Sequence, residues 1–382
     1  MLPAARDAQI DFIRLAGEEP SSLYFEDFLR HGFQAWPSQY RERFPGLASW
    51  QGVAGLKQRL RVHAGAPKDW QTLIASRSLP LLKLGASCLF RVCRTVLTTD
   101  LSWPTYQRTV VVRTIRTGNR VTEAAIRDRV FNEGWNAADV AGHLASEFIR
   151  RGCDGLFLPA VDHLGIRMPI RQIVKRIESV AEVRFCLIDA AQAFCHVPLD
   201  DSFAHADFVV AGSHKWMGAY LPTGIAFFGQ PRSRNLVIRQ LRHQSKAGRM
   251  GDPLSRLTEQ LSYKVLDGRS ETANVTNLFA CAAAAESHAS RISSDSETLA
   301  GINQAIHSTP FPIGHWCESI ISPDLRSRIR LFRQADGKAR SSNAVDVRQQ
   351  WLAAGCVVSG YNGGHARLAF PRSPTPSIGT LA

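Results

Sequence analysis

Between about residue 70 and residue 230, short runs of β-branched and apolar residues alternate with amphipathic stretches. This alternation is typical of a mostly parallel sheet covered by helices. The predicted strands are Thr72–Ala75, Thr95–Thr99, Thr109–Arg113, Gly155–Ala160, Arg184–Ile188, Phe208–Ala211 and Ile225–Phe228. Apolar residues at helical spacing predict the helices Asn136–Arg151, Ile170–Val180 and Asn274–Ser290.

The last hundred or so residues have a different pattern, in which a helix-like run, Ala344–Ala354, lies among short β-rich runs. These runs predict strands at Ser319–Ser322, Ile329–Phe332 and Arg367–Phe370. We therefore expect an α/β chain with an N-terminal arm and first helix (1–40), a large domain (41–275) and a smaller C-terminal α+β domain (276–382).

Apolar runs are too short for a membrane segment, since none reaches the roughly 18 residues that a spanning helix needs. The N-terminal residues mix charges with short apolar steps and lack the continuous apolar region of a secretory signal. These features predict a cytoplasmic protein without a membrane partner.

The chain is basic, with 46 Lys and Arg residues against 33 Asp and Glu residues and a net charge of +13. Arginines are spread from Arg6 to Arg372, and no helix-turn-helix, zinc-finger or RNA-binding signature accompanies them. We interpret them as a solvated surface and expect no nucleic-acid partner. The charge also suits anionic substrates or phosphates.

Eight cysteines are scattered along the chain without a CxxC pair, and several lie in apolar runs. Reduced core thiols fit this pattern better than disulfides or a zinc site. No metal is expected.

Two neighbouring predicted strands each end in a residue of chemical interest. Asp189 ends the run Arg184–Ile188, and Lys215 follows the run Phe208–Ala211. Because the carboxyl ends of parallel strands share one crevice, both side chains are expected in the same pocket. Alone, Asp189 would suit a helix N-cap and Lys215 a solvated lysine. Together they suit pyridoxal 5′-phosphate (PLP), whose aldehyde binds a lysine amine and whose ring nitrogen needs an acid.

The same segment resembles the class V aminotransferase family of PLP-dependent enzymes, which includes cysteine desulfurases, selenocysteine lyases and isopenicillin N epimerase-like proteins. The resemblance is carried by Asp189-x-Ala-Gln192, by Asp207, by Ser213-His214-Lys215 and by Pro222-Thr-Gly224. It implies an aspartate-aminotransferase-like fold with PLP as cofactor, and weaker similarity extends from about Leu60 to Arg367.

The resemblance also implies a role for each residue of this segment. Asp189 would pair with the pyridine nitrogen, and Gln192 would donate a hydrogen bond to the phenolic oxygen. Ser213 and His214 would contact the phosphate. Lys215 would bind the aldehyde and later move protons at the substrate Cα, as a positioned amine can.

A phosphate cradle is expected after the first strand, where Ser76, Arg77 and Ser78 occupy the place of the family's Gly/Thr-rich turn. Backbone N–H groups and a helix dipole at such a turn favour a dianion. The family's glycine is missing here, and an ordinary Ser N-cap is the competing interpretation.

Three further residues follow predicted strands. Trp103 lies where relatives place the ring that stacks on the pyridine, although a core tryptophan would fit equally. Asp162 takes the place of an asparagine that approaches the cofactor oxygen in the family. A carboxylate there would alter the electrostatics, so His163 is an alternative for that contact.

Two matches concern the partner subunit and the substrate. Thr272 resembles a threonine that reaches the phosphate of the other subunit's cofactor, which implies a homodimer with shared active sites, although Glu271 replaces the family's glycine. Arg367 resembles the C-terminal arginine that holds the substrate carboxylate, a group that a guanidinium fork matches in a bidentate way.

The lack of one cysteine narrows the range of reactions that the resemblance allows. Cysteine desulfurases carry a nucleophilic cysteine just before the arginine strand, whereas residues 357–365 contain none. We expect an enzyme that acts on an α-amino acid or its conjugate through an external aldimine and a Cα carbanion, with aminotransferase-type chemistry. A lyase (β- or γ-elimination) or an epimerase is the alternative, and a catalytically silent binding protein is a third.

Overall fold

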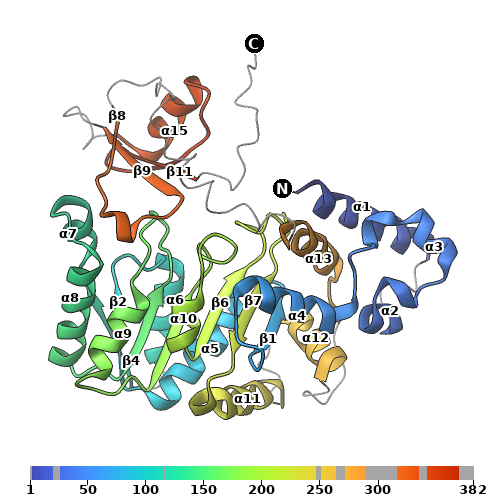
Figure 1. Ribbon diagram of the computed structural model, residues 1–382, viewed down its shortest axis with the longest axis horizontal. Helices are drawn as coiled ribbons and strands as arrows, with labels where there is room; N and C mark the ends of the chain where they lie inside the picture. The colour runs from blue at the N-terminus through green and yellow to red at the C-terminus, as the bar shows by residue number, and fades with distance from the viewer. Residues whose placement is uncertain are drawn as a thin grey trace.

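Seven strands form the central sheet, in the order β1-β7-β6-β5-β4-β2-β3 (Figure 1). Only β7 runs antiparallel to its two neighbours, and the other pairings are parallel. The strands are β1 Gln71–Ala75, β2 Thr95–Thr99, β3 Arg120–Ala124, β4 Gly155–Pro159, β5 Phe185–Asp189, β6 Phe208–Gly212 and β7 Gly224–Phe228. The computed structural model describes residues 2–19, 26–115, 118–246, 251–263, 272–289, 316–334 and 342–369.

Helices cover both faces of this sheet because its central strands are apolar on both sides, as parallel strands are. On one face lie α5 Ser78–Val92, α6 Pro104–Ile115 and α11 Pro231–Lys246. On the other lie α4 Gly52–Ala64, α8 Ala137–Arg150, α9 Ile170–Glu178, α10 Asp200–His205, α12 Pro253–Tyr263 and α13 Thr276–Ala289. Successive residues of β5 alternate between the two cores, with Phe185 and Leu187 on one side and Cys186 and Ile188 on the other.

The predicted α/β class with a mostly parallel sheet is confirmed, but one predicted strand is wrong. Thr109–Arg113 lies inside α6, although its β-branched run favours a strand. Pro104 begins this helix, and Val110 is its one buried side chain, so the valines lie on a mostly exposed surface. The edge strand that was not predicted, β3, follows at Arg120–Ala124.

The N-terminal segment packs against a helix from much later in the chain. It contains α1 Pro3–Glu18, α2 Glu26–His31 and α3 Ser38–Arg43. A further short helix, α7 Arg127–Asn132, lies on the opposite side of the large domain from this segment (Figure 1). Phe12 of α1 stacks on Phe279 of α13, with ring centroids 4.2 Å apart. The buried residues of α13 therefore join the same hydrophobic core as α1 and the central sheet.

A buried ion pair also links two helices of this core, α4 and α12. Lys57 of α4 donates to the carboxylate of Glu259 of α12 at 2.5 Å, and both side chains are almost fully buried. Lys57 Nζ is also 3.2 Å from the Thr258 carbonyl oxygen. Burial lowers the pKa of Lys57, and the nearby carboxylate opposes that effect.

A smaller antiparallel sheet, in the order β10-β11-β9-β8, sits beyond one edge of the central strands (Figure 1). Its elements are β8 Trp316–Glu318, β9 Ile329–Gln334, β10 Ser359–Tyr361, β11 His365–Ala369 and α15 Ala344–Ala353. The prediction of a strand at Ser319–Ser322 is wrong, because β8 ends at Glu318 and the following residues form no strand.

The pleat of β9 separates two environments. Ile329 and Leu331 join the core of the large domain, whereas Phe332 packs beside Trp351 of α15. In β11, Ala366 belongs to the α15 side. Arg333 and Arg367, which alternate with these residues, therefore face the large domain.

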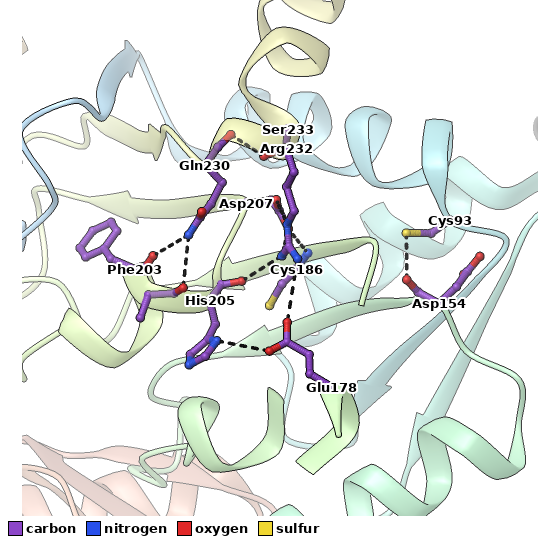
Figure 2. Close-up of polar contacts among 11 residues, drawn as sticks. Cys93, Asp154, Glu178, Cys186, Phe203, His205, Asp207, Gln230, Arg232 and Ser233 are labelled. Carbon is purple, nitrogen blue, oxygen red and sulfur yellow. Dashed lines mark hydrogen bonds and ion pairs between the residues drawn. The ribbon is translucent and has the colours of Figure 1, made fainter. Parts of the chain in front are cut away.

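Asp207, one of the residues that carry the family resemblance, lies at the start of β6, away from the carboxyl edge of the sheet. Its buried carboxylate accepts hydrogen bonds from the backbone N–H of Cys186 at 2.8 Å and from the guanidinium of Arg232 at 2.8 and 2.9 Å (Figure 2). Asp207 therefore fastens β5, β6 and the start of α11 together.

Within the described residues, no helix combines the length and the apolar character needed to cross a membrane.

Candidate active site

The carboxyl ends of β1, β2, β4, β5 and β6 converge on a cavity of about 760 Å³, which the small sheet closes from the other side. Among the predicted site residues, those that line this cavity are Arg77, Ser78, Trp103, Asp162, Asp189, Gln192, His214, Lys215 and Arg367. Residues that are far apart in the sequence thus share one pocket, as the topology of the sheet predicts.

Asp189 and Lys215 occupy the ends of adjacent parallel strands, and each affects the titration of the other. Burial raises the pKa of Asp189 to about 6, while the backbone N–H of Ala191 and the Lys215 amine act in the opposite direction. Burial also lowers the pKa of Lys215, against the stabilising effect of Asp189. The cavity therefore contains a carboxylate that ionises near neutrality and an amine that loses its proton more readily than a solvated lysine.

The turn after β5 is held by a network that the sequence reasoning missed. Trp216 donates its indole N–H to the side-chain oxygen of Gln192 at 3.0 Å. His196 stacks on Trp216 with centroids 3.6 Å apart, and its Nδ1 donates to the Gln192 carbonyl oxygen at 2.6 Å. Its Nε2 accepts from the backbone N–H of Arg328, just before β9. Gln192 is therefore left with its amide NH₂ to offer to a ligand in the cavity.

Asp162 lies at the end of β4, in a turn that packs against the small sheet. Its Oδ1 accepts from the backbone N–H groups of Leu164 and Ile166, at 3.0 and 2.6 Å. Its Oδ2 is buried and has no hydrogen-bond partner among the described residues. Burial raises the pKa of Asp162 to about 7. Gly165 is required nearby, because a Cβ there would meet the Ile329 carbonyl oxygen at 2.4 Å.

Aromatic rings line one side of the cavity. Trp103, which is 43% exposed, meets His163 edge to face at 5.2 Å, and Tyr361 of β10 lies 6.1 Å from the His163 ring. Burial, with the nearby guanidinium of Arg127, lowers the pKa of His163 to about 4. His163 Nδ1 is buried without a partner within the part of the chain that the structure describes. Tyr361 was missed because β10 reads as a Gly-rich loop.

The turn between β1 and α5 differs from the expected cradle in one residue. Ser76 directs both its backbone N–H and its hydroxyl to the carboxylate of Asp252, the residue before α12, and does not line the cavity. Arg77 and Ser78 do line it, and the Ser78 hydroxyl is 2.6 Å from that of Tyr106. The donors of Ser76 are thus engaged by a neighbouring acid, and the contact of Ser76 with a phosphate stays a prediction.

Gly224 explains how β7 can approach this turn. A Cβ at position 224 would lie 2.2 Å from the Arg77 carbonyl oxygen and 2.6 Å from the Ser78 nitrogen. The glycine of the Pro222-Thr-Gly224 motif therefore allows the start of β7 to pass directly against the cradle. Thr223, beside it, is buried and lines the cavity, and it was not among the predicted site residues.

Besides Ser76, two predicted cofactor residues do not line the cavity of this chain. Ser213 is buried, and its hydroxyl accepts from the Thr223 N–H and lies 3.3 Å from the Leu221 carbonyl oxygen. Thr272 is exposed on the segment before α13. Ser213 thus shapes the loop after β6, and Thr272 faces outward.

Arg367 projects from β11 into the cavity, opposite Leu331 of β9 in the strand register. No carboxylate of the described residues lies within ion-pair distance of its guanidinium, and its buried Nε has no hydrogen-bond partner there. A half-buried guanidinium without a protein anion among the described residues is suited to an anionic ligand.

Residues 156–305 match the family model described as aminotransferase class-V. The match spans less than half of the chain, and this part of the chain is similar to the class V aminotransferases. The match covers β4, β5 and β6, and thus Asp162, Asp189, Gln192 and Lys215. The family resemblance and the enzyme class expected from the sequence are confirmed. Class V aminotransferases are PLP-dependent enzymes.

Solved structures of class V-type enzymes share this fold. A cystine C–S lyase in complex with cysteine persulfide aligns with a TM-score of 0.62 at 14% identity, over 97% of this chain and 90% of that one. A ureidoglycine–glyoxylate aminotransferase from Bacillus subtilis gives 0.61 at 12%, over 87% and 80%. An alanine–glyoxylate aminotransferase from Nostoc sp. gives 0.60 at 16%, over 83% and 80%. No curated protein sequence matches the chain.

Proposed function

We propose that this protein is a PLP-dependent enzyme that acts on an α-amino acid or its conjugate, with Lys215 as the residue that binds the cofactor. One observation carries the proposal. The Lys215 amine and the Asp189 carboxylate, from the ends of adjacent strands, line the same cavity. The match to the class V aminotransferases supports the aminotransferase-type chemistry.

The residues of the cavity fit PLP in charge and in hydrogen-bonding capacity. Arg77, Ser78 and His214 supply donors for a phosphate, and Asp189 supplies an acceptor for a protonated ring nitrogen. Among the described residues, the buried Oδ2 of Asp162 has no hydrogen-bond partner and the NH₂ of Gln192 donates to no other group, so a polar ligand can satisfy both. Trp103 offers a ring face, and His163 is an alternative for the oxygen contact.

When bound, PLP supplies an electron-withdrawing ring that stabilises negative charge at the substrate Cα. Asp189 would hold a proton on the ring nitrogen, because a buried carboxylate favours a positively charged partner. Gln192 would donate its NH₂ to the phenolic oxygen. The lowered pKa of Lys215 keeps more of Nζ unprotonated, so that it can act as nucleophile and then accept the Cα proton.

Arg367 orients the substrate in this scheme. Its guanidinium holds the α-carboxylate from the side of the small sheet, which fixes the Cα bond that faces Lys215. Substrate binding thus uses a residue of each sheet, and the cavity between them is the reaction chamber.

We further propose a homodimeric active unit. Thr272 is exposed, so the phosphate contact expected of it requires a second subunit. Sedimentation of the PLP-loaded protein tests this proposal, since a monomer at micromolar concentration would contradict it.

Reduction of the PLP-loaded protein with borohydride tests the central proposal. PLP should add a visible absorbance band, and reduction should fix the cofactor on the peptide that contains Lys215. Lys215→Ala should lose both signals, whereas Lys175→Ala, an exposed lysine on α9, should keep them. A protein that gains no band with PLP would be the silent binding protein.

A panel of amino acids then separates the possible reactions. A keto acid and a cofactor in the amine form would indicate transamination. Ammonia with an unchanged cofactor would indicate elimination, and loss of optical activity alone would indicate epimerisation.

A further inference from the structure

A second cavity, of about 580 Å³, lies directly beside the reaction chamber. His163 and Tyr361 line both spaces, so these two rings form the wall that they share. The second cavity lies between the start of α7 on the large domain and the turn between β10 and β11 on the small sheet. A ligand bound at Arg367 therefore has a neighbouring space into which a side chain can extend.

The small sheet places cationic and hydrogen-bond donor groups at regular spacing from the first cavity to the second. Arg367 and His365 are two residues apart on β11 and face the same side, and Arg333 is the register partner of His365 on β9. Two residues along a strand span about 7 Å, so Arg333 and His365 stand about that far from Arg367. Both of them line the second cavity, as does Arg127 on its opposite wall.

The balance of charge in the second cavity depends on which groups are already engaged. Asp100 accepts the backbone N–H groups of Ile126 and Arg127, at 2.9 and 3.2 Å, and Asp128 accepts from Asn132. Both carboxylates of this cavity thus accept from neutral donors at the start of α7 and keep their negative charge. In contrast, no acid of the described residues lies within ion-pair distance of the Arg333 guanidinium, which is exposed.

The neighbouring histidines report the same positive environment. Burial lowers the pKa of His365, and the guanidinium groups of Arg333 and Arg127 lower it further. His163 experiences the same effect from Arg127 and Arg367. At neutral pH both rings are therefore neutral groups between cations. An anion placed between Arg333 and Arg127 gains their attraction, while the carboxylates of Asp100 and Asp128 are hydrogen-bonded at the start of α7.

We propose that the second cavity is a subsite for the distal anion of the substrate, which is an α-amino acid whose side chain ends in a carboxylate or a phosphoryl group. This inference rests on the proposed function, because it takes the α-carboxylate to be held by Arg367. Arg333 is the residue that selects for the second negative charge, and Arg127 faces it across the cavity. A monocarboxylic amino acid leaves this subsite without a counter-charge.

The proposal is tested by titrating the PLP-loaded enzyme with three ligands and measuring their binding from the change in cofactor absorbance. L-2-Aminoadipate carries a distal carboxylate, L-2-amino-4-phosphonobutyrate carries a phosphonate, and L-norleucine matches the chain length of aminoadipate without the charge. We expect one or both dianionic ligands to bind at least about tenfold more tightly than norleucine, as is usual for a hydrogen bond to a charged group. A tighter phosphonate would identify a phosphorylated substrate, and a tighter aminoadipate a dicarboxylic one.

Arg333→Gln should remove this preference, with dianionic ligands about tenfold weaker and norleucine unchanged. Arg348→Gln is the matched control, because Arg348 is an exposed arginine on α15, on the other face of the small sheet. Norleucine affinity equal to that of both dianionic ligands, or an equal loss for all three in Arg333→Gln, would overturn the subsite alone. Failure of all three to bind would overturn the proposed function as well.

Discussion

The indole N–H of Trp216 donates to the side-chain oxygen of Gln192 at 3.0 Å, and this contact decides which end of the Gln192 amide faces the cavity. Trp216 follows the proposed cofactor lysine directly in the chain, so the loop after β6 orients a residue of the turn after β5. His196 closes the arrangement by stacking on Trp216 and bonding to the Gln192 backbone. Trp216 is thus a positioning residue.

Trp216→Phe should weaken PLP binding about fivefold, because one hydrogen bond that orients Gln192 is lost. Titration of the apoprotein with PLP, followed by absorbance, measures the change. Trp135→Phe is the control, since Trp135 packs against His143 and Arg129, away from the cavity. Equal affinities of Trp216→Phe and the unaltered protein would show that Gln192 needs no such support.

The affinity for PLP should fall as the pH drops below about 6. Burial raises the pKa of Asp189 to about 6, so the carboxylate that would face the ring nitrogen is protonated below that pH. The expected loss is up to about tenfold for each pH unit below the pKa. Asp189→Asn should bind PLP weakly at every pH and without this inflection. An unchanged midpoint in Asp189→Asn would assign the titration to another group.

Asp162→Asn should stabilise the protein at pH 8 but not at pH 4. Burial raises the pKa of Asp162 from 3.8 to about 7, so the folded state retains a proton that the unfolded state releases between these values. The free energy of unfolding therefore falls as the pH rises through this range, and asparagine avoids this loss. The amide oxygen can still accept from Leu164 and Ile166.

Urea unfolding of both proteins at pH 4 and pH 8 measures this difference. Asp69→Asn changes an exposed acid between α4 and β1 and should leave the pH dependence unaltered. If Asp162→Asn followed the same pH dependence as the unaltered protein, Asp162 would not titrate in this range.

Lys57→Met should lower the free energy of unfolding by about 3–5 kcal/mol, because it leaves the Glu259 carboxylate buried without its partner. Lys57→Met combined with Glu259→Leu should recover most of that loss, since no buried charge remains. Chemical denaturation of the three proteins measures the coupling. A double variant no more stable than Lys57→Met would show that the unpaired Glu259 charge does not cause the loss.

The sheet could be predicted where strands are buried on both faces. The runs at 95–99, 208–211 and 225–228 are continuously apolar or β-branched, and the structure has strands at each place. The run at 109–113 has the same composition, but tertiary packing places it in α6. Strand β3 was missed because it is an edge strand with polar residues and mostly incomplete burial.

The site could be predicted as far as strand ends determine it. Asp189 and Lys215 follow apolar runs that pair in parallel, so their meeting was a consequence of topology. Asp252 and Tyr106 could not be found in this way, because their contacts with Ser76 and Ser78 depend on how helices far apart in sequence pack. The position of Trp216 directly after Lys215 indicated that it lies near the site. Its hydrogen bond to Gln192 could not be predicted, because it depends on the direction in which the indole points.

The alternation of β9 and β11 has an evolutionary consequence. Side chains that hold α15, such as Phe332 and Ala366, occupy one face of the small sheet, and Arg333 and Arg367 occupy the other. Natural variation at the second set can therefore retune ligand preference while the packing beneath α15 stays intact. Descendants of such a chain can acquire new specificities by exchanging a few residues on one surface of a sheet whose folding is encoded on its reverse.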